Sequence, residues 1–355
     1  MKKREEISAL DAQLEALKIA FAPVIFQVVR TMREFGILTL LDKNKQGLTL
    51  DEIAKESDIS SYGAKVLLES ALSASVVREE EGRYRLSKIG YFLENDTMVK
   101  TNMAFNHDVN YKGLFDLDRS IKEDRPVGLK VFGDDWDTIY PHLGVLPERA
   151  KKAWFDFDHF YSDSAFDSSI EKLKSFNPKT VLDIGGNTGK FSIRFAKKSE
   201  NINLTILDLP GQIEMAQKNI KENGLEERVN FYPLDILDHE AKIPQGFDII
   251  WMSQFIDCFS EEDAIKILSR VAESMDENSR LCILEPLWDK QRFESASYCI
   301  INTSPYFTAM ANGCSKMFNS TDLFDYIQRA GLEIEETIDN LGVSPHTLVK
   351  CKKSL

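Results

Sequence analysis

A glycine-rich turn in the second half of the chain has the residue types that bring a ligand close to the main chain. Segment 181–189 reads VLDIGGNTG: Asp183 lies near the end of a predicted strand, and Gly185, Gly186 and Gly189 follow it. In an α/β sheet, ligands bind beyond the carboxyl ends of the strands, where glycines allow close approach. The helix predicted over 190–198 adds free N–H groups and the positive end of its dipole. The segment is therefore a candidate ligand cradle.

The spacing of these glycines argues against two common nucleotide loops. A G-x-G-x-x-G loop that starts at Gly185 needs glycine at 187, where the chain has asparagine, and one that ends at Gly189 needs glycine at 184, where it has isoleucine. A P-loop needs lysine followed by serine or threonine, but Lys190 is followed by Phe191. A nicotinamide cofactor is therefore a minor alternative, and a P-loop is excluded.

Two further carboxylates follow the next two predicted strands. Asp208, in ILDLPGQ, can accept hydrogen bonds from both ribose hydroxyls of a nucleoside, and Leu209 can pack on its base. Asp235, in YPLDIL, can accept from an exocyclic amine while Ile236 covers the ring. A single aspartate after a strand often only caps a helix. Because the pattern recurs at successive strand ends, we expect a ligand that contains a nucleoside.

The elements that must position these residues alternate strands with helices. Short apolar runs predict strands at 180–184, 203–207, 229–233, 247–253, 279–285, 332–338 and 345–350. The first five are separated by helical patterns, which is typical of a parallel, doubly wound sheet. The last two are joined by a short loop and should pair antiparallel. The predicted fold class is α/β, with a Rossmann-like sheet that is parallel apart from an antiparallel C-terminal hairpin.

The N-terminal region has a different pattern. Apolar residues recur at helical spacing at positions 14, 17, 21, 24, 28 and 32. Thr49 and Glu52 predict a capping box, a second helix is expected over 64–73 after a turn at Gly63, and the acidic turn 79–82 separates two short strands. This order is typical of a winged helix. We expect a mainly helical, winged-helix-like domain over 1–100, a helical linker over 101–175 and a sheet domain over 176–355.

These motifs, in this order, resemble class I S-adenosylmethionine (SAM)-dependent methyltransferases over residues 176–350. With the N-terminal region, nearly the whole chain resembles the small-molecule O-methyltransferases of bacteria and plants. The segments that carry the resemblance are VLDIGGNTG, TILDLPGQ, FYPLDIL, IIWMSQFIDCFSEEDAIKIL, LCILEPLWD and the final hairpin. The resemblance implies SAM as the cofactor and an N-terminal domain that forms a homodimer. The residues that it implies at the SAM site are Gly185, Asp208, Leu209, Asp235, Ile236 and Ser253. We expect Asp183, Gly186, Gly189 and Gln254 at the same site, with Tyr161 close to the cofactor.

The catalytic positions depart from the pattern of the plant relatives. Where those relatives have a histidine base, in a motif like LHDWxDExxxxIL, this chain has Asp257. Glu285 keeps one supporting carboxylate, and Met317 stands where a second would be. Proton transfer from a phenol to an ordinary aspartate is uphill by roughly 8 kcal/mol, a cost that desolvation near Glu285 would reduce. Asp257 is the first candidate base, and His107 and His159 are the others.

Composition excludes several other classes of protein. The 44 Lys and Arg residues against 57 Asp and Glu residues give a net charge of −13, which is unfavourable for nucleic acid and for acidic membrane surfaces. The five cysteines show no C-x-x-C spacing, and the charged start lacks an apolar signal segment, so we expect free thiols in the cytoplasm. The most apolar stretch, 19–29, is shorter than the ~20 residues of a membrane span.

The function that these patterns predict is SAM-dependent O-methylation of a small hydroxyl compound. Aromatic residues are frequent in the linker region, which favours an aromatic or polycyclic acceptor. We find no carboxylate–asparagine cluster of the kind that a metal-dependent relative would need, and so expect no metal. Two alternatives stay open: a SAM-binding homologue with altered or lost methyl-transfer chemistry, and a winged-helix DNA-binding regulator. The acidic EEEG turn, which would repel phosphate, argues against the regulator.

Overall fold

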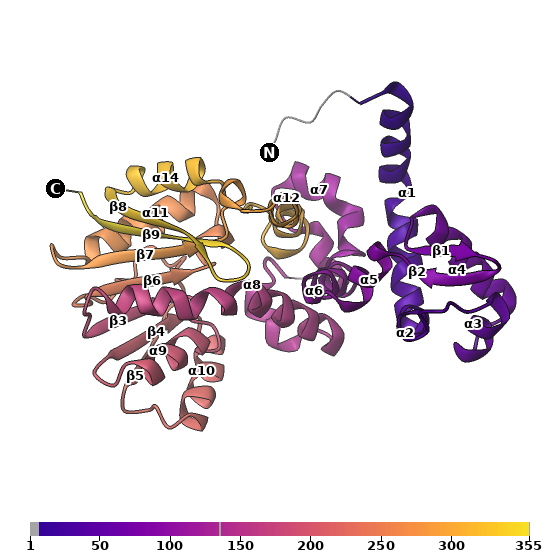
Figure 1. The fold of residues 1–355 in the computed structure, drawn as a ribbon. Coiled ribbons are helices and arrows are strands. Elements are labelled where there is room, and N and C mark those ends of the chain that lie inside the picture. Colours follow the sequence, from indigo (N-terminus) through magenta and orange to yellow (C-terminus); the bar gives the residue numbers. More distant parts are fainter. Residues whose placement is uncertain (1–6, 135, 355) are drawn as a thin grey trace. The chain divides into compact units, whose positions relative to one another are not determined.

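The structure is a computed structural model that describes residues 7–134 and 136–354. The chain divides into two compact units, Met1–Ala104 and Phe105–Leu355 (Figure 1). The region 101–175, predicted as a linker, therefore lies almost wholly in the second unit. Residues 1–6, part of the charged start from which we expect no secretory signal, lie outside the described residues.

The first unit consists of helices followed by a hairpin, in the predicted order. Its elements are α1 (Ala9–Glu34), α2 (Ile37–Lys43), α3 (Leu50–Glu56), α4 (Ser61–Ser73), β1 (Val77–Glu80), β2 (Arg83–Leu86), α5 (Lys88–Asn95) and α6 (Thr97–Phe105), which crosses the boundary. The capping box of Thr49 and Glu52 is confirmed at the start of α3. Helix α4 starts three residues earlier than predicted, because the Ser60 hydroxyl accepts a hydrogen bond from the Gly63 N–H and caps it.

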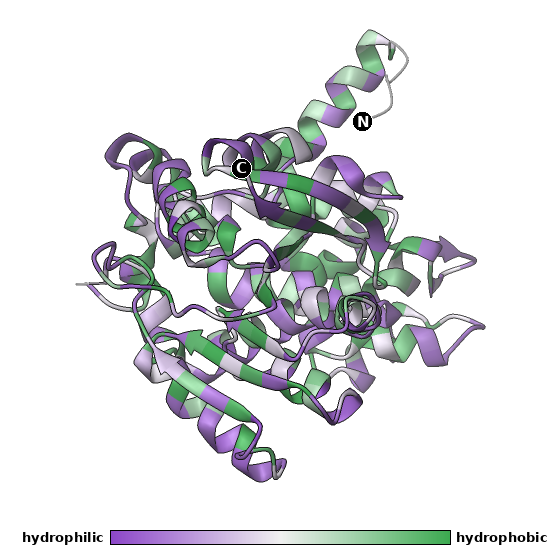
Figure 2. Cartoon of the chain, turned by 90° about the vertical axis from the view of Figure 1, so that its left-hand side faces the viewer, coloured by the Kyte–Doolittle hydropathy of each residue, from purple (hydrophilic) through white to green (hydrophobic). Residues whose placement is uncertain are grey.

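Helix α1 packs only its C-terminal part into the core of the first unit. Val29 and Met32 are buried there. Towards the N-terminus, apolar side chains along one stripe are at least half exposed: Leu10, Leu14, Leu17, Phe21 and Val24. In Figure 2 the ribbon of α1 near the N-terminus shows green segments alternating with purple ones. Among the described residues, α1 is also the one helix that is long and apolar enough to cross a membrane, by length and composition alone. Its apolar part is thus longer than the predicted stretch 19–29.

The second unit contains a seven-stranded sheet that confirms the predicted fold class. Its strands are β3 (Thr180–Ile184), β4 (Asn203–Asp208), β5 (Val229–Pro233), β6 (Ile249–Ser253), β7 (Arg280–Glu285), β8 (Leu332–Leu341) and β9 (His346–Lys353). The strand order is β5-β4-β3-β6-β7-β9-β8. Strands β3 to β7 pair parallel, and β9 pairs antiparallel with both β7 and β8. The direction of the strand order changes at β3, because β4 lies on one side of it and β6 on the other. A ligand site is therefore expected beyond the carboxyl ends of these strands.

Helices cover both faces of this sheet, which explains why its strands are apolar without alternation. One face packs on α11 (Glu261–Ser274) and α14 (Ser320–Arg329). The other packs on α8 (Glu148–Lys174), α9 (Lys190–Lys198) and α10 (Pro210–Glu222). Neighbouring residues of one strand point to opposite faces of the sheet. Val181 packs with α8, α9 and α10, and Leu182 packs with α11 and α14.

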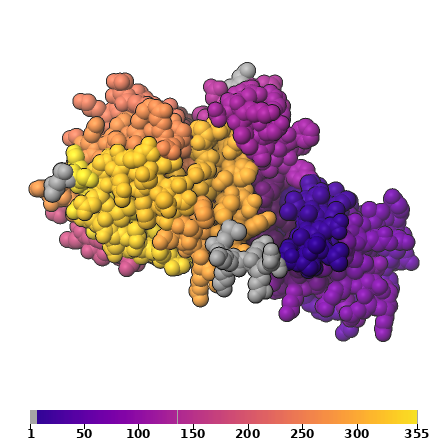
Figure 3. All heavy atoms as spheres, turned by 90° about the horizontal axis from the view of Figure 1, so that it is seen from above, coloured from indigo at the N-terminus to yellow at the C-terminus, as the bar shows by residue number. Residues whose placement is uncertain are grey.

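Short helices before α8 pack against the segment that follows α12 (Glu294–Ile301). These short helices are Asn106–Asn110, Gly113–Asp116, α7 (Leu117–Glu123), Val127–Val131 and Tyr140–Val145, and the later segment holds α13 (Ser304–Tyr306) and Phe307–Ala311. In Figure 3 the purple-magenta atoms of the first group lie beside the orange atoms of the second within this unit. The contact is close at Gly128, where an added Cβ would lie 2.8 Å from the Ala309 carbonyl oxygen. The two segments are thus held as one layer beside the sheet.

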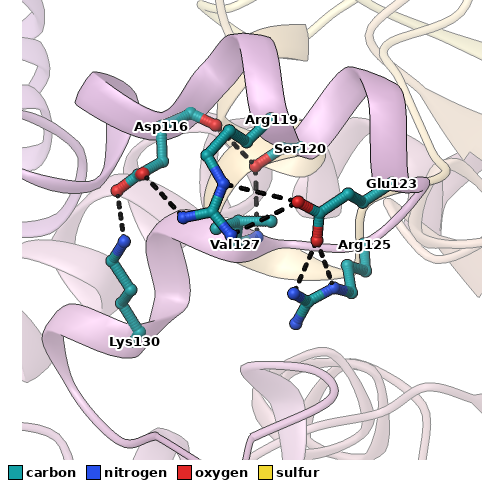
Figure 4. Close-up of polar contacts among 7 residues, drawn as sticks. All are labelled: Asp116, Arg119, Ser120, Glu123, Arg125, Val127 and Lys130. Atoms are coloured by element: carbon teal, nitrogen blue, oxygen red, sulfur yellow. Dashed lines mark hydrogen bonds and ion pairs between the residues drawn. The ribbon is translucent and has the colours of Figure 1, made fainter.

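Ser120 closes the turn between α7 and Val127–Val131 (Figure 4). Its fully buried hydroxyl donates to the Asp116 carbonyl (3.1 Å) and accepts from the Val127 N–H (3.1 Å). Around it, Arg119, whose side chain is 48% exposed, forms ion pairs with Asp116 and Glu123. The interior of the turn therefore depends on the hydroxyl more than on the charges.

We expect Ser120→Ala to lower the free energy of unfolding by about 1–2 kcal/mol, because the Val127 N–H then keeps only its γ-turn bond to the Arg125 carbonyl. Arg119→Ala, the matched control in the same turn, should cost less than about 1 kcal/mol because exposed ion pairs contribute little. Chemical denaturation of the two variants gives the comparison. Equal losses for both would show that the ion pairs hold the turn.

Candidate functional site

A cavity of about 380 Å³ lies at the carboxyl ends of β3, β4 and β6, entirely within the second unit. The strand ends and the loops after them form one half of its wall. Helix α8, the loop around Asp257 and residues of 300–317 form the other half. We call these two parts the strand-end half and the aromatic half.

The glycine-rich turn forms the base of the strand-end half. Gly185 and Gly189 have φ of +75° and +80°, a region that glycine adopts without strain. A side chain at Gly185 would also run into the ring of Phe255. Asp183 is buried beneath the turn, where its carboxylate accepts a hydrogen bond from Ser192 of α9 (2.6 Å), and burial raises its pKa to about 7. Asp183 therefore holds the turn from below.

Asp208 reaches the same turn from the end of β4. Its Oδ2 accepts from the Asn187 N–H (2.8 Å) and its Oδ1 from the Leu209 N–H (2.7 Å). Burial raises the pKa of this carboxyl to about 6. Each carboxylate oxygen has a second lone pair available towards the cavity. The side chain can therefore bind two neighbouring hydroxyl groups of a ligand.

The other predicted residues of the strand-end half also line the cavity. Gly186 does so beyond β3, Leu209 beyond β4, and Asp235 and Ile236 beyond β5. Asp235 is exposed and accepts a hydrogen bond from the Leu237 N–H, whereas Ile236 is buried. The Asp235 carboxylate thus stabilises the turn after β5 and also lines the cavity. Such side chain to backbone hydrogen bonds are common for aspartate in turns.

Ser253 and Gln254 end β6 in a strained turn. The Ser253 hydroxyl lines the cavity and has no hydrogen-bond partner among the described residues. Gln254 has φ of +47°, and its amide lies 3.2 Å from Nε2 of the fully buried His346. Burial lowers the pKa of His346 to about 4, so the ring is neutral at pH 7. A buried, unpartnered hydroxyl beside a fixed amide is typical of a wall that completes its hydrogen bonds with a ligand.

Asp257 lines the aromatic half of the cavity and is only 3% exposed. It sits in the short helix Ile256–Cys258 after β6, and the Cys258 thiol is 3.5 Å from its Oδ1. Burial raises the pKa of Asp257 to about 7, and the neighbouring charge of Asp158 acts in the same direction. The carboxyl is therefore far more basic than an ordinary aspartate.

Glu285 supports this loop from the end of β7 rather than facing the cavity. Its Oε1 accepts from the Phe255 N–H (3.3 Å), and the backbone N–H groups of Ile256 and Asp257 also point to the carboxyl. Burial and the charge of Asp257 raise its pKa well above the ordinary value. Glu285 is thus a positioning residue, in contact with the Asp257 loop.

The two candidate histidines differ in their surroundings. His159, on α8, lines the cavity, and burial with nearby Lys190 lowers its pKa. His107 is not among the described residues that line the cavity; its Nδ1 lies 2.8 Å from Asp108 Oδ1 on the same helical turn. The structure therefore brings His159 near Asp257 and leaves His107 apart.

Helix α8 provides much of the aromatic half, which sequence inspection located only as an aromatic-rich region. Tyr161, 6% exposed, packs beside Phe157, whose ring stacks on Phe105 with centroids 3.9 Å apart. Trp154 donates from Nε1 to the Tyr306 hydroxyl (2.7 Å), which joins α8 to α13 across the cavity wall. This rigid, mostly apolar wall fits a flat aromatic molecule.

Sequence inspection missed Asp158, whose carboxyl also faces this half. Burial, and then the charge of Asp163, raise its pKa to about 7. Its position could have been inferred, because it follows Trp154 by four residues and so shares its helical face. Met317 does line the cavity at the position expected for a missing carboxylate. Asp158 supplies the aromatic half with a second carboxyl from a different element.

These contacts define what the site can do. One half can hold a ligand that presents hydroxyl and amine donors, and the other can hold an aromatic ring beside a carboxyl able to take a proton. Among the described residues, no group of three or more histidine, cysteine, aspartate or glutamate side chains could hold a metal ion.

Family models match both units of the chain. A model described as a Dimerisation2-like domain matches residues 13–84, and one described as an O-methyltransferase domain matches residues 162–331. The first stretch covers most of the helical first unit, and the second runs from the C-terminal half of α8 through strands β3 to β7 and helix α14. The same order was predicted from the motifs.

Individual proteins extend the similarity along the whole chain. L-tyrosine C(3)-methyltransferase of Streptomyces lavendulae is 24% identical over 340 residues, which cover 94% of this chain and 91% of that protein. The structure of SibL, a SAM-dependent methyltransferase, superposes with a TM-score of 0.71 at 21% identity and covers 99% of this chain and 100% of its own. NcsB1 of neocarzinostatin biosynthesis, an O-methyltransferase solved with S-adenosyl-L-homocysteine (SAH) and 1,4-dihydroxy-2-naphthoic acid, gives 0.71 at 17% identity, with 99% and 100% covered.

Proposed function

The chain belongs to the SAM-dependent O-methyltransferase family, and we propose that it transfers the methyl group of SAM to the hydroxyl of a small aromatic metabolite, with Asp257 as the base. The observation that carries this proposal is the position of Asp257. It is a buried carboxyl, with its pKa raised to about 7, in the aromatic half of a cavity whose other half is a nucleoside-type cradle.

The strand-end half fits SAM by the chemistry of its donors and acceptors. Asp208 would bind the two ribose hydroxyls, one to each carboxylate oxygen, with Leu209 and Ile236 on the faces of the adenine. Asp235 would accept from the exocyclic amine of the base. The unpartnered Ser253 hydroxyl supplies a further hydrogen bond on the same wall. When bound, SAM supplies a methyl group activated by the positive sulfonium.

The chain's own residues then have three tasks. The aromatic half, with Trp154 fixed on Tyr306, orients the acceptor ring and excludes water. Asp257 accepts the hydroxyl proton as the oxygen forms its new bond to carbon. Glu285 holds the backbone of the loop that carries Asp257. With a pKa near 7 instead of ~3.9, Asp257 faces a transfer from phenol that is uphill by roughly 4 kcal/mol rather than roughly 8.

Incubation with SAM and a panel of phenols and aliphatic alcohols tests the proposal. We expect SAH to form with phenols, together with a product whose NMR spectrum shows a methoxy signal. A panel in which aliphatic alcohols react faster than phenols would contradict an aromatic acceptor. Binding of NAD instead of SAM or SAH in a calorimetric control would contradict the cofactor.

A second candidate function is methylation of a ring carbon, because one similar protein that spans most of both chains is a tyrosine C(3)-methyltransferase. Removal of a phenol proton makes the ring carbons beside the oxygen nucleophilic as well. Asp257 would thus serve either reaction, and the orientation of the ring would select the atom. An aryl-methyl signal in place of the methoxy signal would identify this reaction.

We also propose that α1 pairs with α1 of a second copy of this chain. The exposed residues Leu10, Leu14, Leu17, Phe21 and Val24 are spaced alternately by four and three residues. This is the spacing of a two-helix coiled-coil seam. The match of residues 13–84 to a Dimerisation2-like domain supports a homodimer rather than a membrane as the cover for this face.

Leu17→Asp should therefore convert the dimer to a monomer at micromolar concentration, because it places a charge in the centre of the seam. Ile19→Asp is the matched control, since Ile19 is 76% exposed and lies off the seam. Sedimentation velocity distinguishes the two variants. A wild type that sediments as a monomer, or equal behaviour of the variants, would contradict the pairing.

A further inference from the structure

The cavity contains more negative charge than the proposed cofactor site accounts for. Seven aspartates line it: Asp158, Asp163, Asp183, Asp208, Asp235, Asp257 and Asp263. Asp183, Asp208 and Asp235 belong to the strand-end half. Asp163 pairs with Lys190 (3.2 Å), and Asp263 accepts from Ser260, the N-cap residue of α11 (2.7 Å). Asp158 and Asp257 remain, and both face the aromatic half.

No basic side chain of the described lining balances these two carboxyls. Lys190 is the one lysine or arginine of that lining, and it is already paired with Asp163. The imidazole of His159 is 3.9 Å from Asp158, too far for a hydrogen bond, and burial keeps the ring neutral at pH 7. The Asp158 carboxylate accepts no hydrogen bond from another described side chain or N–H group.

The charge of Asp158 acts on Asp257, and both carboxyls act on the same wall of the cavity. The charge of Asp158 raises the pKa of Asp257, and both charges raise that of the Tyr306 hydroxyl. Trp154, one helical turn before Asp158, donates a hydrogen bond to the Tyr306 hydroxyl. An acceptor ring held by Trp154 and Tyr306 therefore has two carboxyls on the cavity wall around it, only one of which is needed as a base.

We propose that the acceptor of this methyltransferase carries a protonated amine, and that Asp158 binds this ammonium group while Asp257 faces the acceptor hydroxyl. The inference rests on the proposed function and specifies its substrate class. An ammonium group would neutralise the unbalanced charge and donate to the open carboxylate. It would also lie beside aromatic faces, which attract cations. An acceptor with a carboxylate here would add a third negative charge.

Three phenols that differ only at the end of a two-carbon chain provide the test: tyramine, 4-ethylphenol and 3-(4-hydroxyphenyl)propionate. With the SAH-loaded protein at pH 8, we expect calorimetry to show tyramine binding about 10- to 100-fold more tightly than 4-ethylphenol. The propionate should bind more weakly than either. Equal affinities, or the propionate as the tightest ligand, would overturn the proposal.

Asp158→Asn should remove the preference for tyramine and leave the affinity for 4-ethylphenol unchanged. Asp156→Asn is the matched control, because Asp156 is half exposed on the same helix and pairs with Lys152. The Asp158→Asn protein should still bind SAH and SAM with the wild-type ratio. A specific loss of SAM affinity would show that Asp158 serves the cationic sulfonium, and would overturn the proposal.

The wild type alone provides a further arm that needs no variant. Tyramine binding should weaken as the pH falls from 8 to 5.5, because protonation of Asp158 removes the charge that holds the ammonium. Asp163, Lys190, His159, Asp257 and Tyr306 are the titratable groups around it. The pH dependence of 4-ethylphenol binding is the control, because this ligand lacks the amine and reports only the effects of these other groups. A pH-independent preference would overturn the proposal, whereas failure to bind SAM or SAH at all would instead overturn the proposed function.

Discussion

Asp208→Ala should weaken the binding of SAM and SAH by about 10²- to 10⁴-fold. Two hydrogen bonds from hydroxyls to a carboxylate contribute about 1.5–3 kcal/mol each, and the substitution removes both. It also removes the acceptor for the Asn187 N–H, so the glycine-rich turn keeps its bond from the Gly185 N–H to the Leu207 carbonyl but loses its contact with the end of β4. Isothermal titration of wild type and variant with both ligands measures the loss.

Asp238→Ala is the matched control for this experiment. Asp238 follows β5. Like Asp208, it accepts a hydrogen bond from a backbone N–H group, that of Glu240, but it is exposed and not part of the described cavity lining. Its replacement should leave both dissociation constants unchanged. Unchanged affinity in Asp208→Ala itself would mean that this carboxylate serves only the turn.

Asp257→Asn should lower kcat by about 10²- to 10⁴-fold, the usual contribution of a positioned base. Asparagine keeps the size of the side chain and the contact with the Cys258 loop, but it cannot take up the acceptor proton. The dissociation constant for SAH should stay within about twofold of wild type, because Asp257 is not needed to bind it. Steady-state kinetics and SAH titration on the same preparations separate the two effects.

The pH profile provides a second readout for this residue. Asp257 must be ionised to accept a proton, so kcat/KM should rise with pH up to a plateau above about 7 and fall about tenfold per unit below it. The apparent value belongs to the pair of Asp257 and Glu285, since the charge of Asp257 raises the pKa of the Glu285 carboxyl that supports its loop. The acidic limb should disappear in Asp257→Asn. If His159→Ala removed it instead, the base would be His159.

The sheet could be predicted from the sequence almost residue by residue. Strands β3 and β5 have the predicted bounds, and the other strands differ by one to three residues at an end. Such strands are covered by helices on both faces, so each is a continuous apolar run with polar ends. Helix α4 shows the limit of local patterns: Gly63 suggested a turn, but the cap at Ser60 starts the helix before it.

The strand-end half was predictable for the same reason, because each of its residues directly follows a strand. The aromatic half was not. Asp158 and Trp154 lie on α8, where polar and aromatic side chains share the face that lines the cavity, so no amphipathic pattern separates a binding wall from a core. Their meaning depends on Tyr306, about 150 residues away, and on the fold that brings it there. His107 showed the same chemistry in sequence as His159, yet lies apart from the cavity.

Burial of Asp257 has a consequence for the whole catalytic cycle. With Asp257 as the base, each turnover leaves one proton on a side chain that is 3% exposed and lines the cavity. While the methylated product fills that cavity, water has no access to this proton. The enzyme can therefore return to its reactive state only after the product departs and solvent enters, so product release and deprotonation become one gated event. The negative charge of Asp257 is thus restored when water enters the cavity, and not during the methyl-transfer step.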